Sequence, residues 1–194
     1  MHNGSTVNIF TLANIITALR MLVAPVFFFL LIQADQWAYS WAFLLFVAAA
    51  LTDFADGIMA RRFGEISSLG MFLDPLADKI LVLSALFGFV WLGLIPLWMV
   101  IIVAIRDAYA TVLRVWSFTE GRALVPSRIA KWKTFAQMGF VSSVLALLVA
   151  ASSDSGAVSQ LARTIIESGA LTWAMGGVVL LTIGSLLGYL LRRQ

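Results

Sequence analysis

The sequence predicts an all-α integral membrane protein that forms a single membrane-embedded domain, residues 1–194, with six transmembrane helices. Of the 194 residues, 61% are hydrophobic and only 12% are charged, whereas an ordinary soluble domain has about 45–50% apolar and about 25% charged residues. The apolar residues form long blocks rather than heptads, which argues against a coiled coil. Cysteine is absent, so the chain has no disulfide framework, thiolate metal site or cysteine nucleophile.

Six blocks reach the length of about 20 mostly apolar residues that a spanning helix needs. They cover residues 12–32, 41–60, 71–92, 96–116, 134–151 and 171–191. The first block follows a polar start, residues 1–11, which carries no Lys or Arg. Because this block is too long for the hydrophobic region of a signal peptide and lacks a small-residue cleavage site, we expect residues 1–11 to be a short interfacial segment.

Turn-forming residues separate the later blocks. Polar segments 33–40 and 61–70 flank the second block, and the brief segment 93–95 separates the third block from the fourth. A basic segment, 117–133, precedes the fifth block, and the Ser-rich and Gly-containing segment 152–170, which we expect to be a solvated outer loop, precedes the sixth. The halves of the chain differ in charge and in loop length, so an inverted-repeat transporter gains no support.

The basic residues set the expected orientation in the membrane. All but one of the 13 Lys and Arg residues fall near the chain ends or near the loops 61–70 and 117–133, and only Arg163 falls on the other side. The positive-inside rule therefore places both termini and these two loops in the cytoplasm. We expect Lys79 to extend along the helix toward this interface. The opposite ends carry tryptophans that fit an aromatic belt; they are Trp37, Trp41, Trp91 and Trp98.

Four carboxylates lie toward the cytoplasmic ends of the second and third blocks, namely Asp53, Asp56, Asp74 and Asp78. An Asp at the centre of a membrane helix costs about 2.5–3.5 kcal/mol, so these groups need a compensating partner. At about 100° per helical residue, Asp53 and Asp56 share one face of their helix, as do Asp74 and Asp78. The short intervening loop predicts antiparallel neighbouring helices with both acidic faces at one depth.

An all-oxygen donor set with no His or Cys nearby suits a hard divalent cation such as Mg²⁺ or Mn²⁺. The small residues Gly57, Ala60 and Gly70 leave space for a bulky phosphorylated ligand, and Arg61 could pair with its phosphate oxygens. The alternative interpretation is structural, because a membrane Asp can pair with an Arg and small residues often serve helix packing. Four acids with only Arg61 close in sequence make the structural interpretation the weaker one.

The acids and the small residues form one motif of eight defined positions. With its spacings it is Asp53-x2-Asp56-Gly57-x2-Ala60-Arg61-x8-Gly70-x3-Asp74-x3-Asp78. This motif resembles the signature of the CDP-alcohol phosphotransferase family, integral membrane enzymes that make phospholipid head groups, and every defined position of the signature is present. The resemblance implies the six-helix bundle of that family, with the whole chain as one catalytic domain.

The reaction implied by the resemblance is attack of an acceptor hydroxyl group on the β-phosphorus of a CDP-linked lipid, with release of CMP. The resemblance makes Asp53, Asp56 and Asp74 ligands of two Mg²⁺ or Mn²⁺ ions, and Asp78 the general base as well as a ligand. Such ions neutralise a diphosphate and its leaving group. Residues implied to contact cytidine diphosphate come from three helices; they are Gly57, Ala60, Arg61, Gly70, Asn14, Thr17 and Arg20.

Weaker similarities point to the branch of the family that uses CDP-diacylglycerol as donor and glycerol 3-phosphate as acceptor. Residues 12–20 resemble the opening segment of that branch, although Ala13 stands where a proline is often found. Residues 131–137 and the pair Arg106-Asp107 resemble two further segments, with Asp107 where relatives often have Glu.

A dianionic acceptor needs several cationic donors. The candidates for the acceptor phosphate are Arg106, Arg114, Lys131 and Lys133, of which Arg106 is the most expensive to place in an apolar helix without a use. Arg122 and Arg128 are also near, but membrane topology explains them equally well.

Other interpretations stay open at this point. The same fold and donor could serve another acceptor, namely inositol phosphate, phosphatidylglycerol or serine, and a relative without catalytic activity is a weaker possibility. A cation transporter would need carboxylates near the bilayer midplane with access from both sides, whereas these acids crowd one interface. We expect a multi-pass homodimer in a bacterial cytoplasmic membrane, in contact with membrane lipids and with its active site facing the cytoplasm. No nucleic-acid partner is expected, because membrane orientation accounts for the basic residues.

Overall fold

The computed structural model describes residues 12–63, 68–119, 128–153 and 156–191, with side chains described for residues 21–52, 79–113, 132–153 and 156–186. In this part of the chain all regular secondary structure is helical. The helices are α1 (Leu12–Ile32), α2 (Gln36–Phe63), α3 (Ser68–Trp91), α4 (Leu97–Thr119), α5 (Arg128–Ser152), α6 (Gly156–Glu167) and α7 (Ala170–Leu191). The predicted all-α class is therefore confirmed for the described residues.

The helix boundaries follow from local chemistry at the turns. After α1 the backbone reverses at Ala34, which has a positive φ of 56°. The Asp35 carboxylate then accepts a hydrogen bond of 2.8 Å from the Ala38 backbone N–H, which is the contact of a helix N-cap. After α3 the turn is made by Gly93, with φ of 72°, a conformation that glycine adopts at little cost at the end of a helix.

Six of these helices match the six predicted apolar blocks, and the first block has the boundaries of α1. The segment 152–170, predicted to be a solvated loop, instead contains the 12-residue helix α6. Ser and Gly near its start suggested a loop, but the apolar residues of this segment recur at helical spacing, and Ser159 and Ala162 are buried. Arg163 remains exposed, and its Nε donates to the Ala151 carbonyl oxygen at 2.9 Å.

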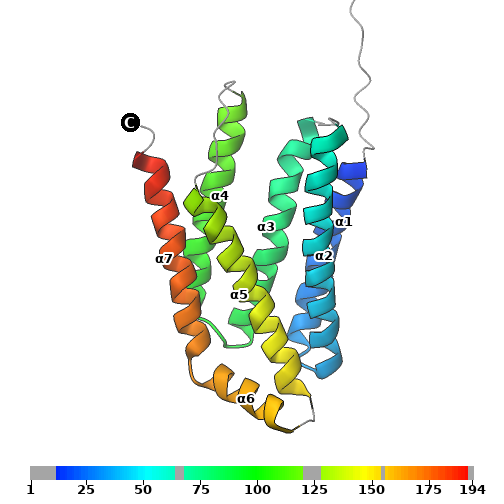
Figure 1. Cartoon of the computed structure of the whole chain (residues 1–194), viewed down its shortest axis with the longest axis vertical. Coiled ribbons are helices and arrows are strands. Elements are labelled where there is room, and N and C mark those ends of the chain that lie inside the picture. Colours follow the sequence, from blue (N-terminus) through cyan, green and yellow to red (C-terminus); the bar gives the residue numbers. More distant parts are fainter. Residues whose placement is uncertain (1–11, 64–67, 120–127, 154–155, 192–194) are drawn as a thin grey trace, which may run out of the picture.

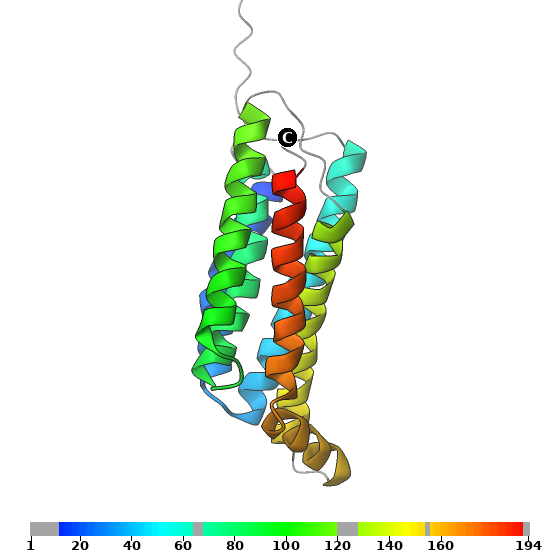
Figure 2. The same ribbon diagram turned by 90° about the vertical axis from the view of Figure 1, so that its left-hand side faces the viewer.

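Six long helices run up and down along the longest axis of the molecule, whereas α6 lies across one end beneath α5 and α7 (Figures 1 and 2). The start of α1, the end of α2, the start of α3 and the end of α7 all lie at the opposite end. We call this the upper end, as in Figure 1. The start of the first helix and the end of the last helix therefore lie at the same end of the bundle.

The most extensive pairing of two helices in the described residues is that of α1 with α3, and α1 also contacts α2. Helix α2 also packs on α5, α3 packs on α4, and α7 packs on both α4 and α5. Among the described contacts, α1 is the principal partner of α3. The predicted contact between the second and third helices concerns residues 53–63 and 68–78, whose side chains lie outside the described residues, so it stays a prediction.

Aromatic and aliphatic side chains fill the interior. Phe27 and Phe46 join α1 to α2 with ring centroids 6.1 Å apart, and Phe89 and Phe140 join α3 to α5 at 6.3 Å in an edge-to-face contact. Gly88 of α3 lies against α1 so closely that an added Cβ would overlap the end of the Leu31 side chain. The absence of a side chain at Gly88 thus allows α1 and α3 to approach closely at this position.

Large apolar side chains also cover the outside, as expected for lipid contact. All four tryptophans predicted to form a belt are exposed, and the helix ends that carry them lie at the lower end of the bundle. By length and hydropathy, one described segment, Trp132–Ser152, qualifies as a membrane span on its own. Helices α6 and α7 qualify together as a second, bent by 58° at their junction. Shorter apolar stretches are Met21–Ile32, Gln36–Thr52 and Lys79–Trp91.

Candidate active site

The predicted metal ligands belong to helices that meet at the upper end of the bundle. Asp53 and Asp56 lie in the last part of α2, and Asp74 and Asp78 lie in the first half of α3. Their side chains fall outside the described residues. Within the side chains that are described, no cluster of three or more His, Asp or Glu residues is placed to hold a metal. The metal site therefore stays a prediction, although the backbone positions of its four proposed ligands are known.

For the residues predicted to contact cytidine diphosphate, too, the structure describes the backbone but not the side chains. Asn14, Thr17 and Arg20 lie in the first half of α1, whose start is at the upper end. The others belong to the end of α2 and the start of α3, and their side chains also fall outside the described residues; they are Gly57, Ala60, Arg61 and Gly70. Three helices that the sequence predicts to share a ligand thus present the relevant segments at one end of the bundle.

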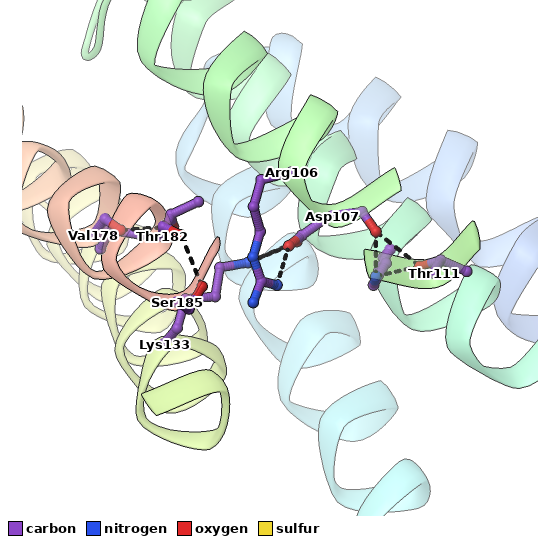
Figure 3. Close-up of polar contacts among 8 residues, drawn as sticks. Arg106, Asp107, Thr111, Lys133, Val178, Thr182 and Ser185 are labelled. Carbon is purple, nitrogen blue, oxygen red and sulfur yellow. Dashed lines mark hydrogen bonds and ion pairs between the residues drawn. The ribbon is translucent and has the colours of Figure 1, made fainter. Parts of the chain in front are cut away.

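Two of the predicted acceptor-binding cations are described, and the structure brings them together. Arg106 of α4 and Lys133 of α5 are both buried, and each contacts the carboxylate of Asp107 (Figure 3). The Lys133 ammonium group donates to both carboxylate oxygens of Asp107, at 2.6 and 2.7 Å. Arg106 Nη1 donates to Oδ1 of the same carboxylate at 3.0 Å. The side chains of Lys133 and Asp107 are only 2% and 7% exposed.

A third cation approaches Asp107 from α3. Lys79 Nζ donates to the backbone carbonyl oxygen of Asp107 at 2.6 Å and also to the hydroxyl group of Thr111. That hydroxyl group donates to the same Asp107 carbonyl at 2.8 Å. The prediction that Lys79 extends along its own helix to the membrane interface is therefore wrong. Its position on α3 alone gave no sign that a polar site on α4 lies within reach.

These contacts define a group of five residues that we call the Asp107 cluster: Lys79, Arg106, Asp107, Thr111 and Lys133. It links three helices that are separate in sequence. A buried carboxylate is tolerated when it is paired and hydrogen-bonded, and three charge-assisted hydrogen bonds meet that condition. The cluster holds three cationic side chains and one carboxylate.

Sequence reasoning found Arg106 and Lys133 but missed the roles of Asp107 and Lys79. The available signal was the position of Asp107 inside an apolar block, where an ionisable residue is costly and usually has a function or a partner. The other two predicted acceptor-binding residues belong to the same helices, Arg114 to α4 and Lys131 to α5. Their side chains lie outside the described residues.

A pocket of about 350 Å³ lies beside the cluster, between α4 and α7. Arg106, Tyr109 and Thr182 are among its lining residues, and the others are isoleucine and leucine. The Thr182 hydroxyl group is turned back to the Val178 carbonyl oxygen at 2.7 Å, as Figure 3 shows. The wall that α7 presents is consequently largely apolar, and Arg106 is the charged group that the pocket shares with the cluster.

Residues 10–184 match the family model described as CDP-alcohol phosphatidyltransferase. Because the match covers most of the chain, the chain belongs to the CDP-alcohol phosphatidyltransferase family.

Individual relatives have more specific names. The chain is 35% identical to the CDP-diacylglycerol--glycerol-3-phosphate 3-phosphatidyltransferase of Bacillus subtilis over 148 residues, which cover 70% of this chain and 77% of the relative. It is 39% identical to a probable phosphatidylglycerophosphate synthase of Mycobacterium tuberculosis, over 65% of this chain and 61% of the relative. It is also 34% identical to a CMP-forming cardiolipin synthase of Streptomyces coelicolor, over 56% and 52% respectively. The chain thus spans about three quarters of the first relative and about half to three fifths of the other two.

Proposed function

We propose that the protein is a phosphatidylglycerophosphate synthase, which transfers the phosphatidyl group of CDP-diacylglycerol to glycerol 3-phosphate and releases CMP. The observation that carries the proposal is the complete eight-position motif within a family match that spans residues 10–184. Three relatives that carry the name of this activity are 35–38% identical to the chain. The buried cations of the Asp107 cluster supply the positive charge that a phosphorylated acceptor requires.

The chemistry of the donor set supports a divalent metal in this proposal. The four acids of α2 and α3 offer only carboxylate oxygens, the chain contains no cysteine, and its one histidine is at position 2. Mg²⁺ and Mn²⁺ prefer such ligands. We propose that Asp53, Asp56, Asp74 and Asp78 hold two of these ions, which when bound neutralise the diphosphate and the leaving CMP.

The remaining site residues have binding and proton-transfer roles in the proposal. Asp78 accepts the proton of the attacking hydroxyl group, because a carboxylate can act as a general base when it is within hydrogen-bond reach. Arg61 pairs with diphosphate oxygens. The small side chains of Gly57, Ala60 and Gly70 leave room for the nucleotide, and the polar residues of α1 hold it from the other side; they are Asn14, Thr17 and Arg20.

For the acceptor we propose that Arg106 and Lys133 bind the phosphate group of glycerol 3-phosphate, together with Arg114 and Lys131. Both described cations lie in one buried cluster, and cationic N–H donors are the groups that bind a phosphate monoester. The Lys133 ammonium group has three N–H donors, and its two described contacts to Asp107 occupy two of them. A buried cationic site also strengthens ionic hydrogen bonds relative to water.

The proposed membrane topology has six spans, with both termini in the cytoplasm. Helices α1 to α5 and α7 contain 21–28 residues, which at about 1.5 Å per residue is enough to cross a hydrocarbon core of about 30 Å. The helix ends that flank the predicted basic loops lie at the upper end of the bundle, which would face the cytoplasm in this topology. We further propose a homodimer in a bacterial cytoplasmic membrane, with the active site on the cytoplasmic side.

The acceptor can be tested directly. Purified protein is given CDP-diacylglycerol, Mg²⁺ and one acceptor at a time, and CMP release is measured. The acceptors are glycerol 3-phosphate, inositol phosphate, phosphatidylglycerol and serine. We expect glycerol 3-phosphate to support the fastest CMP release. CMP release with phosphatidylglycerol but not with glycerol 3-phosphate would instead favour a cardiolipin synthase, the second candidate, which the Streptomyces relative supports. Family membership gives no support to a cation transporter.

A further inference from the structure

The position of Asp107 suggests a role that goes beyond pairing one buried charge. Its carboxylate joins α4 to α5 through Lys133, and its backbone carbonyl joins α4 to α3 through Lys79. One residue thus provides the contact point of three helices. Two of its contacts come from residues that adjoin or belong to the proposed site, because Lys79 directly follows Asp78 and Lys133 is a proposed acceptor ligand.

Electrostatics explains why a carboxylate is needed at this position. Arg106 and Lys133 carry like charges in a buried region, where repulsion is screened much less than in water. Asp107 Oδ1 accepts from both groups, at 3.0 Å from Arg106 Nη1 and 2.6 Å from Lys133 Nζ. A single oxygen atom thus sets the separation of the two cations. Without it, the Lys133 ammonium group would move away from Arg106.

We infer that Asp107 is a positioning residue for the acceptor, acting by holding Arg106 and Lys133 at the spacing that binds a phosphate group. The inference rests on the proposed function of these two cations and adds a residue that neither the motif nor the charge argument identified. The charges of Asp107 and of the acceptor phosphate are both negative, so Asp107 acts through Arg106 and Lys133 rather than by binding the acceptor itself.

The inference predicts a selective kinetic effect. Asp107→Asn keeps the size of the side chain but removes its charge, so the KM for glycerol 3-phosphate should rise at least tenfold while the KM for CDP-diacylglycerol changes less than twofold. Asp107→Glu restores the carboxylate on a longer side chain and should recover part of the lost affinity. The matched control is Glu167→Gln, which neutralises an exposed acid at the end of α6 and should leave both KM values unchanged.

A double substitution tests whether Asp107 acts through Lys133. Lys133→Met by itself should raise the KM for glycerol 3-phosphate. Adding Asp107→Asn to Lys133→Met should raise it less than threefold further, because the residue that Asp107 positions is already gone. Independent roles would instead multiply the two single effects, since separate sites contribute additively to free energy.

Three outcomes would overturn the inference in a folded protein: equal changes in both KM values, no change in either, or fully multiplicative effects in the double variant. Folding is checked by the elution profile in detergent. If Asp107→Asn does not fold, the KM for glycerol 3-phosphate is measured in Asp107→Glu instead. An unchanged KM in that variant would contradict the inference that this carboxylate sets the spacing of the two cations. Failure of the proposed function is distinguishable, since it would appear as wild-type protein that releases no CMP with glycerol 3-phosphate.

Discussion

Lys133 provides the sharpest test of how the buried charges stabilise the fold. Substitution by Met keeps much of the side-chain volume but removes both contacts to the Asp107 carboxylate, at 2.6 and 2.7 Å. The carboxylate, 7% exposed, then keeps the described contact with Arg106 at 3.0 Å. Removal of one partner from a buried ion pair costs about 3–5 kcal/mol, and the retained arginine contact places the expected loss at the low end, about 3 kcal/mol.

For a chain of this length, each kcal/mol lowers the unfolding midpoint by about 2–4 °C, so Lys133→Met should lower it by about 6–12 °C. The assay is thermal unfolding in detergent, followed by tryptophan fluorescence, because the chain contains seven tryptophans. The matched control is Arg163→Met, which removes an exposed cation with one described hydrogen bond to a backbone carbonyl. Its midpoint should fall by less than about 3 °C.

Asp107→Asn in the Lys133→Met background should recover about half of the lost stability, because it removes the carboxylate charge that the first substitution left underpaired. The reasoning is refuted if Lys133→Met unfolds within 2 °C of Arg163→Met. It is also refuted if the double variant is less stable than Lys133→Met, since the cost would then not arise from an uncompensated charge.

Four further predictions concern other parts of the molecule. Asp78→Asn should reduce CMP release by at least a hundredfold, and undiminished release would contradict its proposed role as base. Chelation of divalent ions by EDTA should abolish CMP release from wild-type protein until Mg²⁺ is restored, and undiminished release in EDTA would contradict the proposed metal site. Gly88→Leu should destabilise the fold by about 1–3 kcal/mol because its side chain would overlap Leu31, and an unchanged midpoint of thermal unfolding would refute this. In the cysteine-free chain, a membrane-impermeant thiol reagent applied to intact cells should label Ser168→Cys but not Gln194→Cys, and the reverse pattern would invert the proposed topology.

Much of the architecture could be predicted from hydropathy alone. The length of each apolar block identified six long helices, and the boundaries of α1 were predicted to the residue, because polar segments with strong turn preferences flank the blocks. Helix α6 was missed because it is short and amphipathic, and its first residues resemble those of a loop. The contacts of α1 were also missed, since helix packing depends on close-approach positions such as Gly88, which a hydropathy pattern does not reveal.

In the candidate site, too, some features could be predicted from the sequence and others could not. The acidic motif is local in sequence, so its spacing alone predicts which residues act together, and the described backbone places them in two helices that end and begin at one end of the bundle. The Asp107 cluster is not local, because Lys79, Asp107 and Lys133 are separated by 28 and 26 residues. Sequence reasoning identified Arg106 by its cost in an apolar helix and Lys133 by its charge, but it did not predict that Asp107 is their common partner or that Lys79 contacts the same residue.

The way α4 is packed has a consequence for any large movement in this protein. Helices α1 to α3 form one half of the bundle and α5 to α7 the other; the halves meet directly where α2 and α3 pack on α5, and α4 lies between α3 and α7. Residue 107 bonds to Lys79 in one half and to Lys133 in the other. Any separation of the halves near residue 107 must therefore stretch the Lys79 hydrogen bond or the Lys133 salt bridge, which couples movement between the halves to the internal charge balance.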